Sequence, residues 1–389
     1  MNYKYNCLNP IADCGLNNLG ENYVRTEKFE EADAVFVRSA KMDELVPGAN
    51  LLAVARAGAG VNNIPHAEYA KKGIVVFNTP GANANGVKEL VLLGLLLSAR
   101  DAKGGMAWVD ENKDDELIHK SMEKAKAKFA GTEIRGKVLG VIGLGAIGVL
   151  VSNAAVELGM KVLGYDPFLS VDHALHLDPS VTVVNNTDKI YAESDYVTIH
   201  VPENPSTKGM LNGNAFSQMK EGVAVLNFAR SGLVCESDLK AALESGRVRI
   251  YVTDVPTHAV VNFPHVIAFP HLGASTEESE TNCAIMAVDQ TVDYLENGNI
   301  TNSVNFPSCT LGAAVKPLRV CVAHKNVPNV LSNLTKILGN ASANISDMVS
   351  KSRGDYAYAI FDMDSQVDES VLNAIRSVPD VFRVRVIEK

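Results

Sequence analysis

Two side chains that end apolar segments are suited to acid–base chemistry on an anionic molecule. The segment VAVLNFAR ends in Arg230, and the segment VIAFPH ends in His271. A histidine can take the proton of a hydroxyl group, and an arginine can hold a carboxylate through two parallel hydrogen bonds. A single arginine or histidine is more often structural, but both of these follow strands of one predicted nucleotide-binding domain. We therefore predict that Arg230 and His271 act together on a substrate.

A glycine motif, Gly143-Leu-Gly145-Ala-Ile-Gly148, predicts a nucleotide site beside them. It follows an apolar segment, KVLGVI, and precedes an amphipathic segment, AIGVLVSNAAVELG, so we expect a strand, a tight turn and a helix. This is the context of a dinucleotide-binding turn, in which N–H groups at the helix N-terminus hold the phosphates. The predicted cofactor-binding residues of the turn are Gly143, Gly145, Ala146, Ile147 and Gly148.

An acidic residue specifies which dinucleotide is expected. Asp166 ends the next strand, VLGYD, about 20 residues beyond the glycines, where an acid holds the ribose hydroxyls. Its charge would repel the 2′-phosphate of NADP, and no arginine follows in DPFLS. The predicted cofactor is therefore NAD. A base, a carboxylate-binding arginine and NAD are the groups that oxidise a 2-hydroxy acid by hydride transfer.

Composition and charge exclude several other classes of protein. The chain has 389 residues, a formal net charge of −9 and enough apolar residues for two or three domains. The acidic balance argues against nucleic acid or an anionic membrane as a partner. The start of the sequence lacks the apolar core of a signal peptide, and no apolar run is long enough to span a membrane. Scattered cysteines indicate reduced thiols and a cytoplasmic location. His173 and His176 lack a suitably spaced third ligand, so we predict no metal.

Strand and helix patterns alternate along most of the chain. Buried strands are expected in ADAVFVRSA, LLAVARAGAG and KGIVVFNTP, and six more between KVLGVI and VIAFPH. Between these two series, VLLGLLLSARDA is apolar nearly all round and predicts a buried helix, and residues 110–128 predict a solvated one. The alternation indicates parallel sheets with covered faces, an α/β fold. Residues 318–389 instead follow the ferredoxin-like order βαββαβ.

Eight stretches together resemble the D-isomer-specific 2-hydroxyacid dehydrogenases, and within them the branch that acts on D-3-phosphoglycerate. They are VRSA (37–40), RAGAGVNNIP (56–65), NTPGANANGVKEL (78–90), KFAGTEIRGKVLGVIGLGAIG (128–148), GYDP (164–167), HVP (200–202), GVAVLNFARSGLV (222–234) and PHLGAST (270–276). The resemblance implies a doubly wound Rossmann-type NAD domain and a flavodoxin-like, discontinuous substrate domain. The tail resembles an ACT regulatory domain.

The resemblance also implies the domain boundaries. Residues 1–93 would form the first segment of the substrate-binding domain, and residues 94–273 the NAD-binding domain. Residues 274–305 would contribute a return helix that completes the substrate domain. A linker over 306–317 would lead to the ACT-like domain at 318–389.

The resemblance assigns a role to each predicted site residue. His271 would be the acid/base, and Arg230 would bind the carboxylate and polarise the C2 oxygen. Arg38 would reach the substrate phosphate. The implied substrate-binding residues are Arg38, Arg56, Ala57, Gly58 and Asn78. The implied further cofactor-binding residues are His200, Val201, Pro202, Thr207, Ala229, Asp254 and Gly273.

One departure from the family concerns the partner of the histidine. The family normally has a glutamate a few residues after the strand that ends in Asp254, and this glutamate pairs with the histidine. The corresponding stretch here, TDVPTHAVVNFPH, contains no glutamate. By the resemblance Asp254 lies near the nicotinamide amide, so it is not an obvious replacement.

The implied activity is NAD-dependent oxidation of D-3-phosphoglycerate to 3-phosphohydroxypyruvate, the first step of serine biosynthesis, in a homodimer or homotetramer. The alternatives are a D-glycerate/hydroxypyruvate or an erythronate-4-phosphate dehydrogenase, and a non-catalytic NAD-sensing corepressor. The retained Arg230 and His271 count against the corepressor.

The tail carries a further expectation, that of an effector site. By the resemblance, L-serine would bind between two side-by-side tails. The implied effector residues are His324, Asn326, Asn344 and Ile345. Asn329 stands where the family usually has a glycine in the loop around the amino acid.

Overall fold

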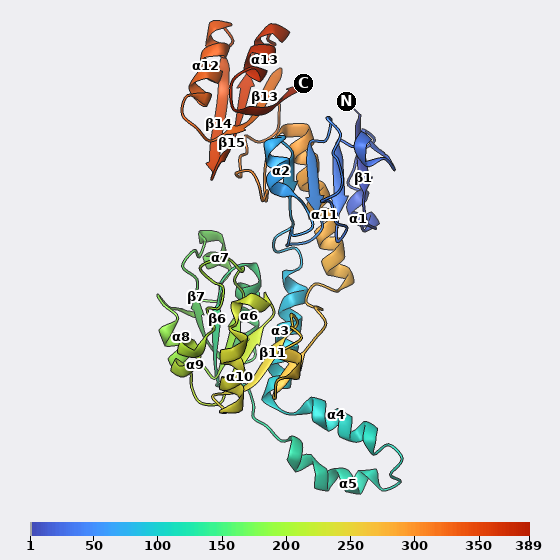
Figure 1. The fold of residues 1–389 in the computed structure, drawn as a ribbon, viewed down its shortest axis with the longest axis vertical. Coiled ribbons are helices and arrows are strands. Elements are labelled where there is room, and N and C mark those ends of the chain that lie inside the picture. Colours follow the sequence, from blue (N-terminus) through green and yellow to red (C-terminus); the bar gives the residue numbers. More distant parts are fainter. Residues whose placement is uncertain (1) are drawn as a thin grey trace. The chain divides into compact units, whose positions relative to one another are not determined.

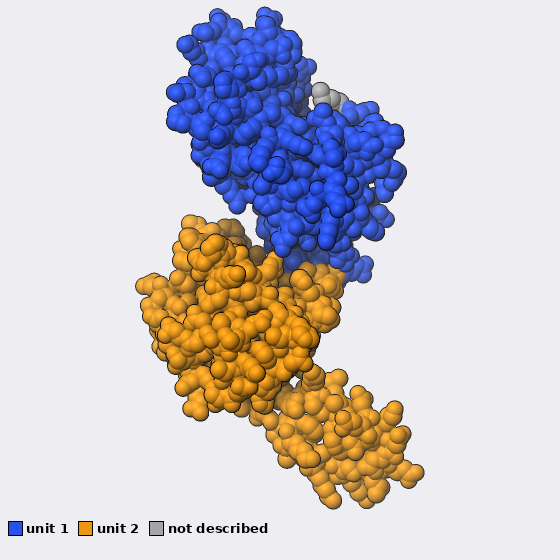
Figure 2. All heavy atoms as spheres, viewed as in Figure 1, with its two compact units in different colours: residues 1–83, 277–389 blue, residues 84–276 orange. Residues whose placement is uncertain are grey.

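The computed structural model describes residues 2–389, which form two compact units (Figures 1 and 2). Unit 1 comprises Met1–Asn83 and Glu277–Lys389, and unit 2 comprises Ala84–Thr276. This division places residues 84–93 and 274–276 in unit 2 and residues 318–389 in unit 1. No helix within residues 2–389 is long and apolar enough to cross a membrane. The same residues contain no group of three or more His, Cys, Asp or Glu side chains that could hold a metal ion.

The first sheet of unit 1 is parallel and has the flavodoxin-like order β2-β1-β3-β4-β5. The buried, apolar β3, β4 and β5 correspond to the three strands expected from the sequence. The pattern does not reveal β1 and β2, because β1 alternates with polar residues and β2 is short. The strands are β1 (Tyr3–Cys7), β2 (Tyr23–Arg25), β3 (Ala34–Val37), β4 (Ala53–Arg56) and β5 (Val75–Phe77).

Helix α11 packs on this sheet through contacts with β3, β4 and β5, and on its other neighbour α1. Glycine permits the close approach of α1, because a Cβ on Gly15 would lie 2.6 Å from the carbonyl carbon of Ala284. Gly298, at φ +74°, ends the helix in a left-handed conformation. These helices are α1 (Asp13–Leu16), α2 (His66–Lys71) and α11 (Glu277–Asn297), with the 3₁₀ turn η1 (Phe29–Glu31).

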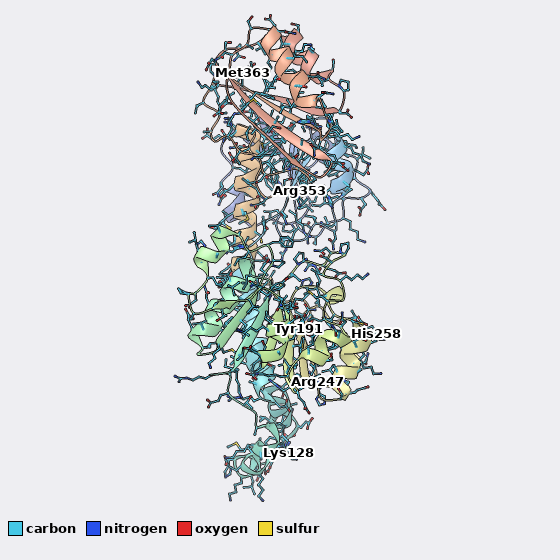
Figure 3. The ribbon with its side chains drawn as sticks, turned by 90° about the vertical axis from the view of Figure 1, so that its left-hand side faces the viewer. Lys128, Tyr191, Arg247, His258, Arg353 and Met363 are labelled. Atoms are coloured by element: carbon cyan, nitrogen blue, oxygen red, sulfur yellow. The ribbon has the colours of Figure 1, made fainter. Side chains whose placement is uncertain are left out.

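The tail has the ferredoxin-like order that its sequence predicts. Its antiparallel sheet, β14-β15-β13-β16, packs against α12 and α13 around a separate apolar cluster. Figure 3 labels Arg353 and Met363 toward opposite ends of this sheet, and Arg353 Nη1 donates to the Ser303 carbonyl at 2.9 Å. The elements are β13 (Leu318–Lys325), α12 (Val330–Asn340), β14 (Ile345–Arg353), β15 (Tyr356–Met363), α13 (Glu369–Arg376) and β16 (Val381–Glu388).

The two sheets of unit 1 share a hydrophobic core. Tyr294 of α11 and Tyr358 of β15 belong to one buried cluster, with ring centroids 6.5 Å apart. The expected linker, residues 306–317, takes part in this core, because Phe306 and Cys309 are buried in the same cluster. The tail is therefore packed against the flavodoxin-like part of unit 1.

Two buried arginines reinforce this packing. Arg385 lies over the ring of Tyr294, 4.4 Å from its centroid, and donates to the Tyr294 carbonyl at 2.8 Å. Arg319 donates two hydrogen bonds to the Asp362 carboxylate, at 2.6 and 2.7 Å, and a third to the Asn297 carbonyl at the end of α11. Such buried charges are tolerated only when they are paired and hydrogen-bonded.

The sheet of unit 2 is parallel, with the order β12-β11-β10-β9-β6-β7-β8. The chain runs from β6 to β7 and β8 on one side, then returns to β9 on the other. This reversal defines the doubly wound Rossmann-type fold, in which ligands bind beyond the carboxyl ends of the strands at the reversal. The strands are β6 (Val138–Ile142), β7 (Lys161–Tyr165), β8 (Thr182–Val183), β9 (Tyr196–Ile199), β10 (Val223–Asn227), β11 (Val248–Thr253) and β12 (Val266–Ala268).

Helices cover both faces of this sheet, each over its own apolar cluster. On one face α3 packs against α6, β10 and β11. The sequence predicts a buried helix here; much of α3 is buried, while Leu93 and Leu96 are about half exposed. The helices are α3 (Ala84–Ala99), α4 (Ala102–Glu111), α5 (Ile118–Ala125), α6 (Ala146–Glu157), α7 (Val171–His176), α8 (Asp188–Glu193), α9 (Gly213–Gln218) and α10 (Glu236–Glu244). The 3₁₀ turns are η2 (Lys126–Phe129), η3 (Ser231–Leu233) and η4 (Val260–Asn262).

Replacing Arg319 with leucine is expected to destabilise unit 1. The Asp362 carboxylate would stay buried without its charged partner, which costs about 3–5 kcal/mol of unfolding free energy. Lys316→Met is the matched control, because the Lys316–Asp364 pair is solvent-exposed and its loss should change stability little. Urea unfolding followed by circular dichroism measures both variants. Equal stability of the two would contradict this role of Arg319.

Candidate functional site

The glycine turn of unit 2 has the geometry of a phosphate-binding turn. Gly143 follows β6 at φ +96°, and a Cβ there would lie 2.6 Å from the His200 carbonyl oxygen. A Cβ on Gly148 would overlap the Gly143 carbonyl, so α6 can pack this closely only without a side chain. At Gly145 a Cβ would meet nothing within 4 Å. The turn is therefore tightly packed against protein at Gly143 and Gly148, and it has free space at Gly145, just before α6 begins at Ala146.

Asp166, at the end of β7, holds this turn in place. Its Oδ2 accepts a hydrogen bond from the Leu144 N–H at 2.9 Å, and its Oδ1 accepts one from the Phe168 N–H at 2.8 Å. The carboxylate therefore lies beside the glycine turn, where a ribose would follow a bound pyrophosphate. The bond to Leu144 is a second role that the sequence pattern does not reveal.

His200 directly follows β9, beside the glycine turn, and is neutral at physiological pH. Burial lowers the pKa of its imidazole to about 4. Its Nε2 lies 3.0 Å from Thr198 Oγ1. Two residues on, the Pro202 carbonyl accepts a hydrogen bond from Thr207 Oγ1 at 2.6 Å, which closes the loop. Of the predicted cofactor-binding residues, His200, Val201, Pro202 and Thr207 therefore lie on one loop at the reversal of the sheet.

Arg230 is positioned by a buried asparagine at the end of β10. Asn227 is fully buried, and its Nδ2 donates to the Arg230 carbonyl at 2.9 Å and to the Tyr251 hydroxyl at 3.1 Å. Its Oδ1 accepts from the Ala229 N–H at 3.1 Å. The turn that presents Arg230 is therefore held from both sides, and Arg230 Nη1 donates to the Ala229 carbonyl at 2.7 Å.

His271 is held by the aspartate at the end of β11. The His271 N–H donates to the Asp254 carbonyl at 2.9 Å, and the Gly273 N–H donates to Asp254 Oδ2 at 3.0 Å. His271 itself has a left-handed backbone, φ +53°, which is uncommon for a residue with a side chain. These two hydrogen bonds to Asp254 fix that conformation.

Asp254 follows β11, which lies between β10, the strand before Arg230, and β12, the strand before His271. Burial raises the pKa of the Asp254 carboxyl, while the hydrogen bond from Gly273 and the nearby charges of His271 and Arg230 lower it. Asp254 is 2% exposed, and its Oδ1 has no hydrogen-bond partner among the described residues. Unit 2 thus places His271, Arg230 and a buried carboxylate at one edge of the sheet.

The segment after β11, which lacks the glutamate usual in the family, has the carboxylate of Glu236 nearby. Thr257 Oγ1 donates to Glu236 Oε1 at 2.7 Å, and Glu236 begins α10. His258, labelled in Figure 3, follows Thr257 in the same loop. Glu236 is engaged with this threonine, and the structure gives no direct hydrogen bond between Glu236 and His271 in the described part of the chain.

The predicted substrate-binding residues lie at the carboxyl ends of β3, β4 and β5 in unit 1. Arg56 Nε donates to the Arg38 carbonyl at 2.9 Å, and the Thr79 N–H donates to the Gly58 carbonyl at 3.1 Å. Asn78 Nδ2 donates to the Ala59 carbonyl at 2.6 Å. Ala57 continues β4, because its N–H donates to the Val37 carbonyl. The predicted group is therefore contiguous.

The polar residues of the tail largely have partners within the tail. His324 is buried, and its Nδ1 lies 2.8 Å from the Lys325 carbonyl. Asn326 Nδ2 donates to the Gly354 carbonyl at 2.9 Å, and Asn344 Nδ2 donates to the Asp364 carboxylate, just before Ile345 begins β14.

Asn329, where the family usually has a glycine, has a left-handed backbone at φ +71° before α12. Asparagine tolerates this conformation better than most residues.

Two comparisons bear on this arrangement. Residues 94–273 match the family model described as D-isomer specific 2-hydroxyacid dehydrogenase, NAD binding domain. The D-3-phosphoglycerate dehydrogenase of Escherichia coli is 31% identical over 345 residues, which are 84% of this chain and 79% of that protein. The chain belongs to the D-isomer-specific 2-hydroxyacid dehydrogenase family. Its glycine turn and Asp166 lie in the NAD-binding domain of that family.

Other relatives extend this comparison. Human D-3-phosphoglycerate dehydrogenase is 34% identical over 317 residues, 78% of this chain, but the chain spans only 57% of the human protein. The NAD⁺-bound 3-phosphoglycerate dehydrogenase of Entamoeba histolytica has a TM-score of 0.60 at 26% identity, covering 78% of this chain and 99% of that chain. The D-mandelate dehydrogenase of Rhodotorula graminis shares the fold, with a TM-score of 0.65 at 20% identity over 78% of this chain and 98% of that chain.

Three residues that support the candidate site are not apparent from sequence patterns. The signal for Asn227 is its position directly before the Phe-Ala-Arg turn, because an asparagine side chain often caps such a turn. Tyr251 reads as an ordinary strand residue. Glu280 reads as one of several acids in the first turn of α11, but its Oε1 lies 2.6 Å from Arg38 Nη2.

The stability of this chain is expected to depend on pH through His200. Because the folded-state pKa lies below the ordinary value of 6.5, the stability that neutral His200 contributes is present above about pH 6.5 and is lost as pH falls toward 4. Relative to His200→Asn, the wild-type unfolding free energy should therefore fall by up to about 3 kcal/mol over this range.

Denaturant unfolding at several pH values measures this difference. His176→Asn is the control, because that ring is 71% exposed. Parallel pH profiles for wild type and His200→Asn would mean that the ring is not buried as a neutral group.

Proposed function

We propose that this chain oxidises D-3-phosphoglycerate to 3-phosphohydroxypyruvate with NAD⁺, the first step of serine biosynthesis. The observation that carries the proposal is that Arg230, buried Asp254 and His271 follow three adjacent strands, β10, β11 and β12, at the carboxyl edge of the Rossmann-type sheet, with His271 hydrogen-bonded to Asp254. The relatives named D-3-phosphoglycerate dehydrogenase support the choice of substrate.

Each catalytic side chain has a distinct part in this proposal. His271 accepts the proton of the C2 hydroxyl and returns it in the reverse direction. Arg230 binds the substrate carboxylate and polarises the C2 oxygen. When bound, NAD⁺ supplies the acceptor for the C2 hydride. Asp254 is a positioning residue, because it fixes the backbone of His271 and Gly273.

The cofactor site is proposed from the residues that fit NAD. Open space at Gly145 and the N-terminus of α6 suit a pyrophosphate, and Asp166 suits the ribose hydroxyls. The unpartnered Oδ1 of buried Asp254 suits a carboxamide N–H. We assign the loops at the strand ends to the rest of the cofactor: His200, Val201, Pro202, Thr207, Ala229 and Gly273.

The substrate phosphate is assigned to unit 1. Arg38 and Arg56 are adjacent cations at the ends of β3 and β4, and Ala57, Gly58 and Asn78 offer neighbouring backbone and amide groups. A second candidate is a 2-hydroxy acid without a phosphate, such as D-glycerate. The ion pair that Arg38 already makes with Glu280 favours this alternative.

The tail is proposed to be an ACT-type regulatory domain that binds L-serine between two copies. Its edge strand β14 carries mostly exposed side chains, which leaves that edge for a second tail. His324, Asn326, Asn344 and Ile345 are the assigned effector residues.

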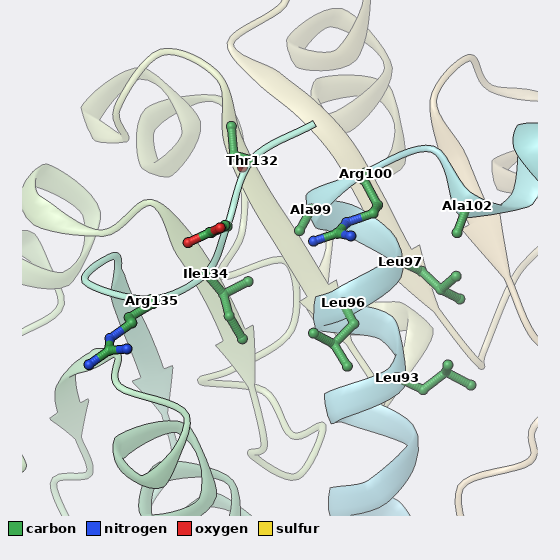
Figure 4. A pocket seen from close by; sticks show the side chains of 10 residues that line it. Leu93, Leu96, Leu97, Ala99, Arg100, Ala102, Thr132, Ile134 and Arg135 are labelled. Carbon is green, nitrogen blue, oxygen red and sulfur yellow. The ribbon is translucent and has the colours of Figure 1, made fainter. Parts of the chain in front are cut away.

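A dimer through unit 2 is proposed independently of the tail. The α4–α5 hairpin extends from its unit, and Met106, Val109 and Leu117 on it are about half exposed or more. At its base, an open cavity of about 480 Å³ lies between Leu93, Leu96 and Leu97 of α3 and the segment 132–135 (Figure 4). Apolar side chains from a second hairpin would suit this groove.

A cytoplasmic location is also proposed. It is supported by the six free cysteines, since a reducing compartment keeps thiols unpaired.

Turnover tests the proposed reaction. The wild-type chain should reduce 3-phosphohydroxypyruvate with NADH and oxidise D-3-phosphoglycerate with NAD⁺. His271→Asn should lower kcat by about 10²–10⁴-fold, as expected for loss of a general base. Arg230→Gln should raise KM and lower kcat together. Exposed His258→Asn is the control and should leave both constants unchanged. NADH binding without turnover in the wild type would favour the corepressor instead.

Light scattering with and without L-serine tests the two proposals on assembly. A dimer mass is expected without serine, and Met106→Glu combined with Val109→Glu should give monomers.

Millimolar L-serine should inhibit turnover by the full-length chain. An unchanged rate would leave the tail without an effector role, and a wild-type monomer would refute the hairpin interface.

A further inference from the structure

One ion pair lies at the edge of unit 1 where the substrate phosphate is assigned. Arg38 Nη2 lies 2.6 Å from Glu280 Oε1, and the two side chains are 43% and 46% exposed. Arg38 follows β3, and Glu280 lies in the first turn of α11, more than 240 positions later in the chain. The proposed anion-binding cation thus already has an anionic partner from the protein itself.

The backbone of Arg38 is fixed, although its guanidinium is exposed. Asn9 Oδ1 accepts hydrogen bonds from the N–H groups of Arg38, Ser39 and Ala40, at 2.9, 3.0 and 2.9 Å. The Arg38 carbonyl accepts another from Arg56 Nε. Only the end of the Arg38 side chain can therefore change partner without disturbing the loop.

The surrounding side chains belong to one electrostatic cluster. Cys283 lies one turn beyond Glu280 on α11 and is buried. Burial raises the pKa of its thiol, the charges of Arg38 and Arg56 lower it, and the charge of Glu280 raises it. The charges of Arg38, Arg56 and Glu280 therefore all lie near the Cys283 thiol. Among these three side chains, one carboxylate faces two guanidinium groups.

We propose that Glu280 is a specificity-determining residue that occupies Arg38 in the resting enzyme and is exchanged for the distal anion of the substrate. This inference rests on the proposed function. An exposed ion pair in water is weak, so a phosphate can displace the carboxylate. A substrate with a neutral tail leaves the pair intact. Glu280 therefore reduces the advantage that a phosphorylated substrate has over an unphosphorylated one.

If Glu280 is exchanged for the substrate phosphate, its effect on the binding of a phosphorylated substrate is opposite to the effect of a residue that positions Arg38. If Glu280 competes, its removal frees Arg38 and strengthens the binding of a phosphorylated substrate. If Glu280 instead oriented Arg38 for the phosphate, its removal would weaken the same binding. The two roles are thus separated by the sign of the change in KM.

The experiment compares D-3-phosphoglycerate with D-glycerate, which lacks the phosphate, using the full-length chain and NAD⁺. Glu280→Gln should lower KM for D-3-phosphoglycerate about two- to fivefold at unchanged kcat, the range expected for an exposed ion pair. KM for D-glycerate should stay unchanged. Glu278→Gln is the matched control, because Glu278 is an exposed carboxylate in the same helical turn.

A double-mutant cycle isolates the pair. Arg38→Met should raise KM for D-3-phosphoglycerate, and adding Glu280→Gln to Arg38→Met should then change nothing further. Circular dichroism spectra that match the wild type exclude misfolding as the cause. Calorimetric titration of D-3-phosphoglycerate into the chain with NADH gives the same comparison without turnover.

The outcomes separate the two proposals. A wild-type chain that turns over D-3-phosphoglycerate, with Glu280→Gln unchanged or raised in KM, overturns the exchange and leaves the proposed function intact. An equal fall in KM for both substrates also overturns the exchange, because it would be a general charge effect. A wild-type chain that neither turns over nor binds D-3-phosphoglycerate overturns both proposals.

Discussion

Parallel strands of one sheet end at the same edge, and the candidate site of this chain depends on that constraint. In unit 2 the glycine turn follows β6, His200 follows β9, Arg230 follows β10 and Asp254 follows β11. In unit 1 the same rule places Arg38, Arg56 and Asn78 at the carboxyl ends of β3, β4 and β5. Within each unit, site residues that are far apart in the sequence therefore lie at the same edge of the sheet, because each of them is at or just after the end of a strand.

Hydrogen bonds near the strand ends then fix the local conformation of these residues. Asp254 fixes the backbone of His271 and Gly273, and Asn227 fixes the turn before Arg230. Asp166 holds the glycine turn through Leu144. Each contact also satisfies a backbone N–H or carbonyl group near the end of a strand, so the same interaction positions the site and stabilises the fold.

The glycines of the site are predictable from the sequence because the backbone at these positions permits only one kind of residue. Gly143 and Gly148 are readable because a Cβ would collide with His200 or with the turn itself. The pairing of Arg38 with Glu280 could not be predicted, because it joins residues that only the packing of α11 on the sheet brings together. Likewise, the βαββαβ order of strand and helix patterns predicts the fold of the tail. The burial of Arg319 and Arg385 could not be predicted, because arginines are usually exposed and these two are buried only by the packing of the tail on the rest of unit 1.

A crystal structure of the full-length chain with NAD⁺ and 3-phosphohydroxypyruvate, two oxidised compounds that cannot react with each other, tests the central claim most directly. The account predicts a pyrophosphate beside Gly145, a ligand carboxylate bound by Arg230 and a C2 oxygen within hydrogen-bond distance of His271. A ligand bound with neither Arg230 nor His271 in contact with it would contradict the account.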